Sequence, residues 1–152
     1  MCGISGILSL NGSPVEKAII QTMSEKLRHR GPDNAGLYFS EDGMVGLAHR
    51  RLAVIDLSPE GHQPMSFQKR YWITYNGEIY NYKEIREFLS SKGFKFQSDS
   101  DTEVLLAAYQ FWGEDCLQEF DGMFAFAIWD EEAKTLFCAR DRFGEKPFYY
   151  SY

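Results

Sequence analysis

The chain begins Met1-Cys2-Gly3-Ile4-Ser5-Gly6-Ile7, and this stretch decides how the rest is interpreted. A small second residue such as Cys2 permits removal of the initiator methionine, which would leave one residue with both a thiol and a free α-amine. A thiol is the most nucleophilic common side chain, and an α-amine titrates near ~7.7–8.0, close to the ideal for a general base. The alternative is a cysteine placed by chance in a loose terminus.

The residues that follow Cys2 favour the catalytic interpretation. Apolar Ile and Leu residues are separated by small Gly and Ser residues over positions 3–10. This pattern indicates a buried strand whose glycines allow close backbone approach. A terminus built like a core strand holds its first residue in place, as a nucleophile requires.

Composition limits the classes of protein that the chain can represent. Its 152 residues suffice for one domain with a sizeable core, and a net charge of −6 argues against nucleic acid and anionic membranes. No apolar stretch approaches the roughly 18 residues that span a bilayer, and the N-terminus lacks the shape of a secretory signal. Cys2, Cys116 and Cys138 are odd in number and widely spaced, which is typical of free thiols in the cytoplasm. The last two are predicted to be small buried residues.

Three helices are expected from their capping patterns. Residues 13–16 read Ser-Pro-Val-Glu, a capping box with proline at the first helical position. The core stripe of that helix would be formed by Val15, Ile19, Met23 and Leu27, with Ile20 beside them. Asn81 with Glu84, and Ser100 with Glu103, repeat the capping pattern before two further helices. Residues 114–119 are expected to add one or two turns.

The expected strands come mostly as hairpins. Residues 35–40 pair with 45–50, and 123–130 with 135–140, while 71–75, 53–55 and 147–152 are single strands and 57–66 is a loop. Hairpins with helices clustered between them indicate an α+β fold with antiparallel sheets. Strands that are apolar on both faces, such as 123–128, predict two sheets packed face to face with helices outside.

Seven blocks of sequence resemble the glutaminase domain of class II glutamine amidotransferases, with the closest likeness to the glutamine-hydrolysing asparagine synthetase branch. The blocks run in the family order over almost the whole chain, and together they are specific where each alone is weak. They are Cys2-Gly3-Ile4-x-Gly6, Arg28-His29-Arg30-Gly31-Pro32-Asp33, His49-Arg50-Arg51-Leu52-Ala53-Val54-Ile55-Asp56, Asn76-Gly77-Glu78-Ile79-Tyr80-Asn81, Ser100-Asp101-Thr102-Glu103, Gly122-Met123-Phe124-Ala125-Phe126-Ala127 and Arg140-Asp141-Arg142-x-Gly144-x-Lys146-Pro147.

The resemblance implies an N-terminal nucleophile hydrolase fold, an αββα sandwich of two mainly antiparallel sheets, with a glutaminase domain over residues 1–152. It implies hydrolysis of L-glutamine to L-glutamate through a Cys2 thioester, with ammonia passed to a synthetase domain that makes asparagine from aspartate and ATP. The glutaminase step needs no cofactor. ATP and Mg²⁺ belong to the synthetase domain, whose Ser-Gly-Gly-x-Asp-Ser loop is absent from the sequence. We expect the chain to be a C-terminally truncated part of a longer protein, and a homodimer is left open.

The resemblance also assigns the reacting groups. Cys2 Sγ is the nucleophile, and its α-amine accepts the proton by way of a water. The side-chain amide of Asn76 and the backbone N–H of Gly77 are the two oxyanion donors. The alternative for Asn76-Gly77 is a simple hairpin turn, but the following residues lead to a helix cap and not to a partner strand.

Free glutamine is a zwitterion, so its two charged ends need partners. Arg51 matches the role of the guanidinium that grips the α-carboxylate through two parallel hydrogen bonds. Asp101 matches the carboxylate for the α-ammonium, although it could equally stabilise the dipole of its helix, and the two roles are compatible. Glu78 is expected at the ammonium end or the pocket wall, and Leu52 and Val54 are expected to lend backbone groups.

Other polar residues receive structural interpretations. Arg50 should point away from Arg51, since neighbours in a strand alternate, and it is expected at the surface or against the sheet. The spacing of His29, His49 and His62 matches no ligand pattern, so no metal site is expected. The charged segment from Arg28 to Asp33 is assigned no chemical step.

A second hypothesis is a domain that binds glutamine, or merely folds, without turnover. A retained Met1 would mask the amine of Cys2 and favour this hypothesis. A third is the glutaminase part of an amidotransferase with another ammonia acceptor, because relatives that amidate sugars or other acids share this domain.

Overall fold

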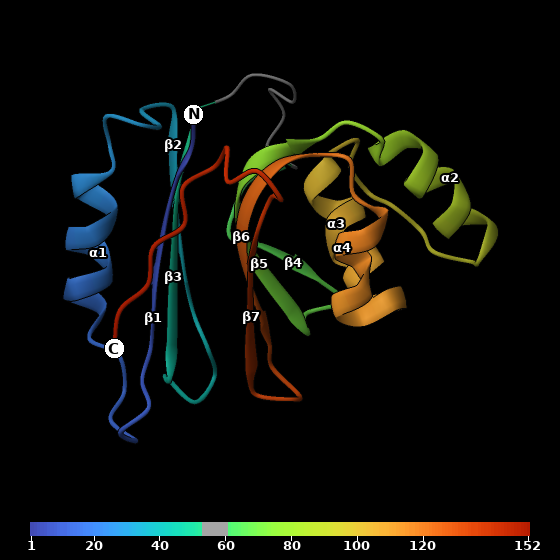
Figure 1. Ribbon diagram of the computed structural model, residues 1–152. Coiled ribbons are helices and arrows are strands. Elements are labelled where there is room, and N and C mark those ends of the chain that lie inside the picture. The colour runs from blue at the N-terminus through green and yellow to red at the C-terminus, as the bar shows by residue number, and fades with distance from the viewer. Residues whose placement is uncertain (53–60) are drawn as a thin grey trace.

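The computed structural model describes residues 1–52 and 61–152, which form two sheets between two layers of helices (Figure 1). In the described residues the elements are β1 (Gly3–Leu8), α1 (Lys17–Lys26), β2 (Asn34–Phe39), β3 (Val45–Arg51), β4 (Met65–Phe67), β5 (Tyr71–Ile79), α2 (Tyr82–Ser91), α3 (Asp101–Trp112), the 3-10 turn η2 (Gly113–Asp115), α4 (Cys116–Glu119), β6 (Gly122–Asp130) and β7 (Thr135–Arg140).

Both sheets are antiparallel. The first sheet has the order β1-β3-β2 and the second the order β4-β5-β6-β7. Helix α1 covers the outer face of the first sheet, and α2, α3 and α4 lie on the outer side of the second (Figure 1). The prediction of an α+β sandwich with helices outside and two sheets within is therefore confirmed.

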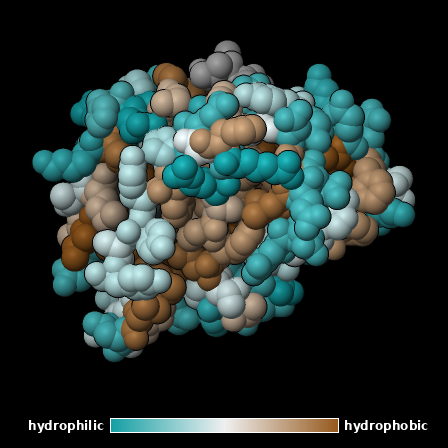
Figure 2. Space-filling view, in the orientation of Figure 1, coloured by the Kyte–Doolittle hydropathy of each residue, from teal (hydrophilic) through white to brown (hydrophobic). Residues whose placement is uncertain are grey.

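Two apolar cores hold the layers together. The larger lies between the second sheet and its helices, and includes Ile73, Leu89, Leu105 and Phe126. The smaller lies between the two sheets and is built from Tyr38, Val45, Leu47 and Trp129. In the space-filling view, hydrophobic residues form a band between more hydrophilic margins of the molecule (Figure 2). Burial of the side chains in these two cores is the main stabilising term of such a sandwich.

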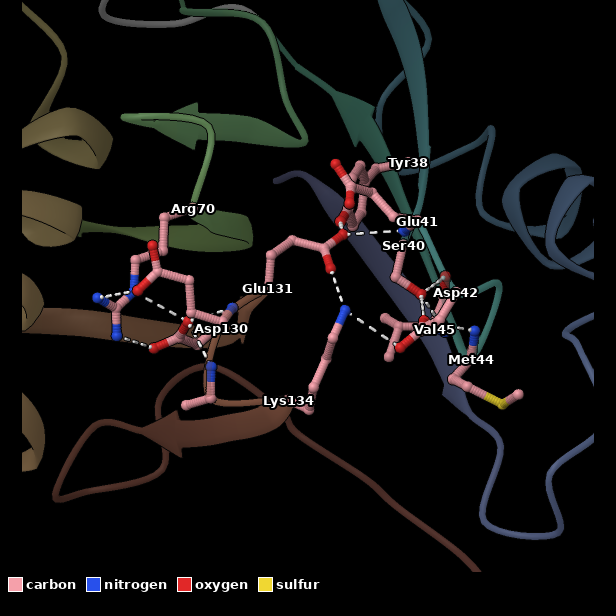
Figure 3. Close-up of polar contacts among 12 residues, drawn as sticks. Tyr38, Ser40, Glu41, Asp42, Met44, Val45, Arg70, Asp130, Glu131 and Lys134 are labelled. Carbon is pink, nitrogen blue, oxygen red and sulfur yellow. Dashed lines mark hydrogen bonds and ion pairs between the residues drawn. The ribbon is translucent and has the colours of Figure 1, made fainter.

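Polar contacts join the sheets at the end where the β2–β3 and β6–β7 turns meet (Figure 3). The Tyr38 hydroxyl donates to Glu131, which also accepts from the Glu41 N–H at 3.1 Å. The Lys134 Nζ lies 2.8 Å from Glu131 Oε2 and 3.2 Å from Asp42 Oδ2. Burial, and then the hydrogen bond to Glu131 and its charge, raise the pKa of Tyr38, which therefore stays a donor. We call the group of Tyr38, Glu41, Asp42, Glu131 and Lys134 the hairpin clip.

Helix α1 departs from its prediction. It begins at Lys17, and no side chain caps it. The chain before it is held elsewhere, because the Val15 N–H donates to the carbonyl of Gly43 at 2.8 Å. The predicted core stripe is wrong at Ile19, which is 45% exposed. Ile20 is buried as expected, and Ser24, which was not predicted, is buried beside it.

The caps of the other two helices differ from each other. Asn81 precedes α2 but makes no cap bond; its side-chain amide donates to the Glu119 carbonyl at 2.9 Å and accepts from the Asp121 N–H at 3.0 Å. Asn81 thus ties α2 to the end of α4. Ser100 does cap α3, because its hydroxyl accepts from the Thr102 N–H at 3.1 Å.

Several strand predictions need correction. Strand β5 runs through Asn76-Gly77 to Ile79, so the predicted end at residue 75 is wrong, and the alternative of a simple hairpin turn at Asn76-Gly77 is excluded. Strand β4 begins inside the predicted loop 57–66, at Met65. Residues 147–152 form no strand, and Tyr149, Tyr150 and Tyr152 are exposed. The expected strand at 53–55 lies outside the described residues.

Candidate active site

Cys2 lies at the start of the first sheet, next to the end of β3. Its Sγ is 3.5 Å from the backbone nitrogen of Leu52 and 3.8 Å from the Leu52 carbonyl oxygen. The Arg30 guanidinium donates to the Cys2 carbonyl at 3.1 Å. Cys2 is half-buried, and Met1 precedes it with its sulfur 3.2 Å from the Lys146 ammonium. The first residues of the chain are therefore fixed at both sides.

The segment from Arg28 to Asp33, which received no role from the sequence, helps to fix this end of the sheet. A Cβ at Gly31 would lie 2.6 Å from the backbone nitrogen of Arg51, so the segment passes directly over β3. The Asp33 N–H donates to the Arg51 carbonyl at 3.1 Å. Together with the bond from Arg30, these contacts hold the nucleophile candidate and the end of β3 as one unit.

The two neighbouring arginines of β3 were predicted to point to opposite faces. Arg50 turns toward α1, where its guanidinium donates to the Ser24 carbonyl and hydroxyl and pairs with Glu25. It is buried, so a surface position for it is wrong. The pairing of Gly3 with Arg50 places Cys2 opposite Arg51. Arg51 and Cys2 therefore share the face that looks toward the second sheet.

Alternate side chains of β5 point toward that face of the first sheet. The Thr74 hydroxyl donates to the Ala48 carbonyl of the first sheet at 3.0 Å, so even-numbered side chains of β5 point between the sheets. Asn76 and Glu78 belong to this set and lie toward the end of the strand. Asn76 is buried and Glu78 half-buried. The four candidates Cys2, Arg51, Asn76 and Glu78 therefore face one interlayer space.

The backbone donors of β5 are divided between two neighbours. Beyond one end of the β5–β6 pair, the Tyr80 N–H donates to the backbone carbonyl of Asp121 at 2.7 Å. Beyond the other end, the Glu131 N–H donates to the backbone carbonyl of Arg70 at 3.0 Å. The ladder alternates, so even-numbered residues of β5 bond to β6 and odd-numbered ones point the other way. Gly77 is odd-numbered, and its N–H thus points away from β6.

Side chains satisfy the donors on either side of Gly77. The Tyr75 N–H donates to Gln63 Oε1 at 2.7 Å, and the Ile79 N–H donates to Asp101 Oδ2 at 3.1 Å. Strand β4 reaches only as far as Ile73. By this alternation neither β4 nor β6 accepts from the Gly77 N–H, and within residues 1–52 and 61–152 no side chain accepts from it either. One backbone donor is thus left open beside Asn76.

Only glycine fits at position 77. An added Cβ would lie 2.7 Å from the Phe124 Cα and closer still to the Met123 carbonyl oxygen, both on β6. The constraint comes from the backbone of the neighbouring strand. Asn76-Gly77 is thus strand backbone with a close approach to β6.

Asp101 links α3 to the end of β5. Its Oδ2 accepts from the Tyr75 hydroxyl at 2.7 Å as well as from the Ile79 N–H. Burial, with a smaller contribution from the charge of Glu78, raises the pKa of Asp101, while the hydrogen bonds act in the opposite direction. Burial and the nearby Asp101 raise the pKa of Tyr75 well above its ordinary value, and Cys2 contributes to that shift. These groups therefore lie within electrostatic reach of one another.

Two residues with a part in this arrangement were missed from the sequence. Gln63 fell in a predicted loop, although its buried side chain bonds to β5. His49 was assigned a structural role, and its Nε2 lies 3.1 Å from the Tyr75 carbonyl oxygen. Burial lowers the pKa of His49 to about 4, so the ring is neutral. The signal for His49 was available, because it shares the strand face of Arg51 two residues on.

The remaining predictions concern single residues. Val54 lies outside the described residues, and Leu52 contacts Cys2 through its backbone. Cys116 is buried as expected, but Cys138 is exposed, because it lies on the last strand of the second sheet. In the part of the chain that the structure describes, no three His, Cys, Asp or Glu residues are placed to hold a metal ion. The helices described there are too short or too polar to cross a bilayer.

Two solved structures share this architecture. Glutamine phosphoribosylpyrophosphate amidotransferase from Bacillus subtilis superposes with a TM-score of 0.69 at 23% identity, over 91% of this chain and 37% of that one. A structure described as the allosteric regulatory enzyme of purine biosynthesis gives a TM-score of 0.74 at 24% identity, with the same coverage. These likenesses show that the chain shares the fold of these two proteins.

The chain belongs to the family of glutamine amidotransferase domains, whose model matches residues 1–152. Asparagine synthetase [glutamine-hydrolyzing] 1 of Bacillus subtilis is 45% identical over 99% of this chain and 24% of its own length. Putative asparagine synthetase [glutamine-hydrolyzing] 2 of Methanocaldococcus jannaschii is 42% identical over 99% of this chain and 32% of its own length. Amidase chry2 of Gibberella zeae is 40% identical over 99% of this chain and 24% of its own length. The chain thus spans a quarter to a third of these relatives.

Proposed function

We propose that this chain is the glutaminase domain of an asparagine-synthetase-like amidotransferase, and that it hydrolyses L-glutamine through a thioester on Cys2. The family supports the reaction class, and the names of the relatives in Bacillus subtilis and Methanocaldococcus jannaschii support the whole-protein activity. The observation that carries the proposal is the open N–H of Gly77 beside Asn76. Both residues lie on β5, which faces the first sheet, and Cys2 directly precedes β1 of that sheet.

The reaction begins when removal of Met1 frees the α-amine of Cys2. That amine takes the thiol proton through a water, and the thiolate attacks the side-chain carbonyl carbon of glutamine. The oxygen of the tetrahedral intermediate gains negative charge, which the Asn76 amide and the Gly77 N–H stabilise. When the intermediate collapses, the carbon–nitrogen bond breaks and the leaving nitrogen takes the proton back from the α-ammonium. Water then hydrolyses the thioester to release glutamate.

The charged ends of glutamine bind at the rim of the same interlayer space. Arg51 grips the α-carboxylate in a bidentate pair. Asp101 and Glu78 face the α-ammonium, and a bound cation there stabilises the ionised form of Asp101, which burial otherwise disfavours. Leu52 and Val54 contribute backbone groups. No part of this step needs a cofactor.

The direct test is Cys2→Ala in the intact protein, with Cys138→Ala as the matched control at an exposed thiol. We expect glutamate release to be lost in the first variant and unchanged in the second. Mass spectrometry of the wild type with glutamine, quenched in acid, should find a glutamyl adduct on the peptide that begins with Cys2. Undiminished hydrolysis by Cys2→Ala would end the proposal.

The acceptor of the ammonia is proposed to be aspartate, activated by ATP with Mg²⁺ in a synthetase domain outside this chain. The intact Cys2→Ala protein should then still form asparagine from aspartate, ATP and free ammonia. The amidase name of the Gibberella zeae relative makes another acceptor the competing possibility. Failure of aspartate to support ATP consumption in the presence of ammonia would favour that possibility.

A passive glutamine-binding domain is the competing function class. It predicts that Met1 is retained, which blocks the amine of Cys2 in a peptide bond. Intact mass of the purified protein separates the two, since the enzyme requires the loss of one methionine.

A further inference from the structure

Gln63 stands where β4 would otherwise continue along β5. Met65 pairs with Ile73, so the same register extended by two residues would set Gln63 opposite Tyr75. Strand β4 begins only at Met65, and the side chain of Gln63 takes over the bond that its backbone would have made. Its Oε1 accepts from the Tyr75 N–H at 2.7 Å. The donor immediately before the Asn76-Gly77 pair is thus satisfied by a side chain.

The other end of the same amide reaches α3. Gln63 Nε2 donates to the Thr102 hydroxyl at 3.2 Å, in the first turn of that helix. Both residues are buried, with 6% of Gln63 and 3% of Thr102 exposed. Thr102 follows Asp101, whose carboxylate binds the Tyr75 hydroxyl and the Ile79 N–H. One amide therefore joins β5, the strand of the oxyanion donors, to Thr102, the residue directly after Asp101.

The backbone of Gln63 is fixed against the first sheet. A Cβ at Gly36 of β2 would lie 2.9 Å from the Gln63 carbonyl carbon. Gly36 pairs with His49, whose ring contacts the Tyr75 carbonyl. Gln63 therefore meets the first sheet through its backbone, and the second sheet and α3 through its side chain.

We propose that Gln63 is a positioning residue of the glutaminase site, which holds Tyr75 and therefore the Asn76-Gly77 donors in register with Asp101 on α3. This inference rests on the proposed function. A side-chain carboxamide suits this role, because it holds an acceptor oxygen and a donor nitrogen at fixed separation. Displacement of a reacting group by about 1 Å typically costs ~10²-fold in rate, so the donors depend on such support.

The test compares Gln63→Met with Gln110→Met in the intact protein. Gln110 lies near the end of α3 and bonds to Gln68 through its amide at the surface, so it controls for the loss of an amide on that helix. We expect Gln63→Met to lower kcat for glutamate release about 30- to 100-fold with KM changed less than about threefold, and Gln110→Met to leave both unchanged. Hydrogen exchange of the peptide that contains Tyr75 should speed up in Gln63→Met only.

A second pair covers the case in which Gln63→Met does not fold. Thr102→Val removes the hydroxyl that Gln63 binds, whereas Thr102→Ser keeps it. We expect kcat to fall about tenfold in the valine variant and to stay near wild type in the serine variant. Equal activity in both variants, or equal loss in both, would overturn the proposal.

The outcomes separate this inference from the function on which it rests. An active wild type with kcat unchanged in Gln63→Met, despite faster exchange at Tyr75, overturns only the positioning role. A wild type that releases no glutamate overturns the proposed function, and the inference with it. Iodoacetamide labelling of Cys2 at the wild-type rate in Gln63→Met would show that the thiol is intact, so that the loss of kcat belongs to the donors.

Discussion

Replacement of Gly77 by alanine tests the geometry of the donor pair directly. The new Cβ would lie 2.7 Å from the Phe124 Cα, whereas ordinary contacts begin at 3.4 Å, so β5 and β6 must separate locally by roughly 0.7 Å or more. The obstacle is backbone in the middle of a sheet, which cannot rotate aside. Overpacking of this kind typically costs about 1–3 kcal/mol, and a misplaced oxyanion donor typically costs about 10²–10³ in kcat.

The assay is kcat for glutamate release together with urea denaturation of the same preparation. Gly46→Ala is the matched control, because a Cβ there would lie 2.7 Å from Ile20 Cγ1 on the α1 side of β3, far from the donors. We expect Gly46→Ala to lose stability with kcat unchanged, and Gly77→Ala to lose both. Activity of Gly77→Ala within threefold of wild type would refute the assignment of its N–H.

Three further predictions address other parts of the molecule. Arg51→Lys should raise KM for glutamine about tenfold or more, because an ammonium cannot form the bidentate pair; an unchanged KM would remove Arg51 from the site. Burial holds the pKa of His49 near 4 in the folded protein, against ~6.5 when unfolded. Between these two pH values the unfolded chain binds one proton more than the folded protein. The free energy of unfolding should therefore decrease as the pH is lowered through that window, by up to ~1.4 kcal/mol per pH unit. His49→Gln should flatten this slope in urea titrations from pH 7 to 4.5, and an identical slope would contradict the assignment. Tyr38→Phe should cost about 1 kcal/mol by removing one bond of the hairpin clip, with kcat unchanged; lost activity would mean that the clip and the site are coupled.

The fold class followed from the sequence because strands and hairpins there keep a clear period. The pairing of β6 with β7, for example, agrees with the predicted hairpin to within one residue. The start of α1 did not follow, since Ser13 and Pro14 carry the local signal of a helix N-terminus. The Gly43 carbonyl, which is distant in sequence, holds Val15 instead, and local propensity yields to that contact.

The site was accessible to sequence reasoning only in part. Alternation along β3 separated Arg51 from Arg50, and the contact of Arg50 with Ser24 places that side chain on the α1 side of the sheet. The contribution of Gln63 could not be predicted, because it depends on where β4 stops and on which helix lies beside β5. Asn76-Gly77 shows the same limit: the pair is common in turns, and only the β6 partner makes it a strand.

The row of outward backbone donors on β5 has a consequence for what can bind there. A free strand margin normally invites a second polypeptide to extend the sheet, which is the usual route to aggregation. Here Gln63 and Asp101 occupy the positions on either side of Gly77. A second polypeptide therefore cannot form a continuous ladder along this part of β5, because the donors on both sides of Gly77 are already bonded. A single carbonyl oxygen can still accept from the Gly77 N–H.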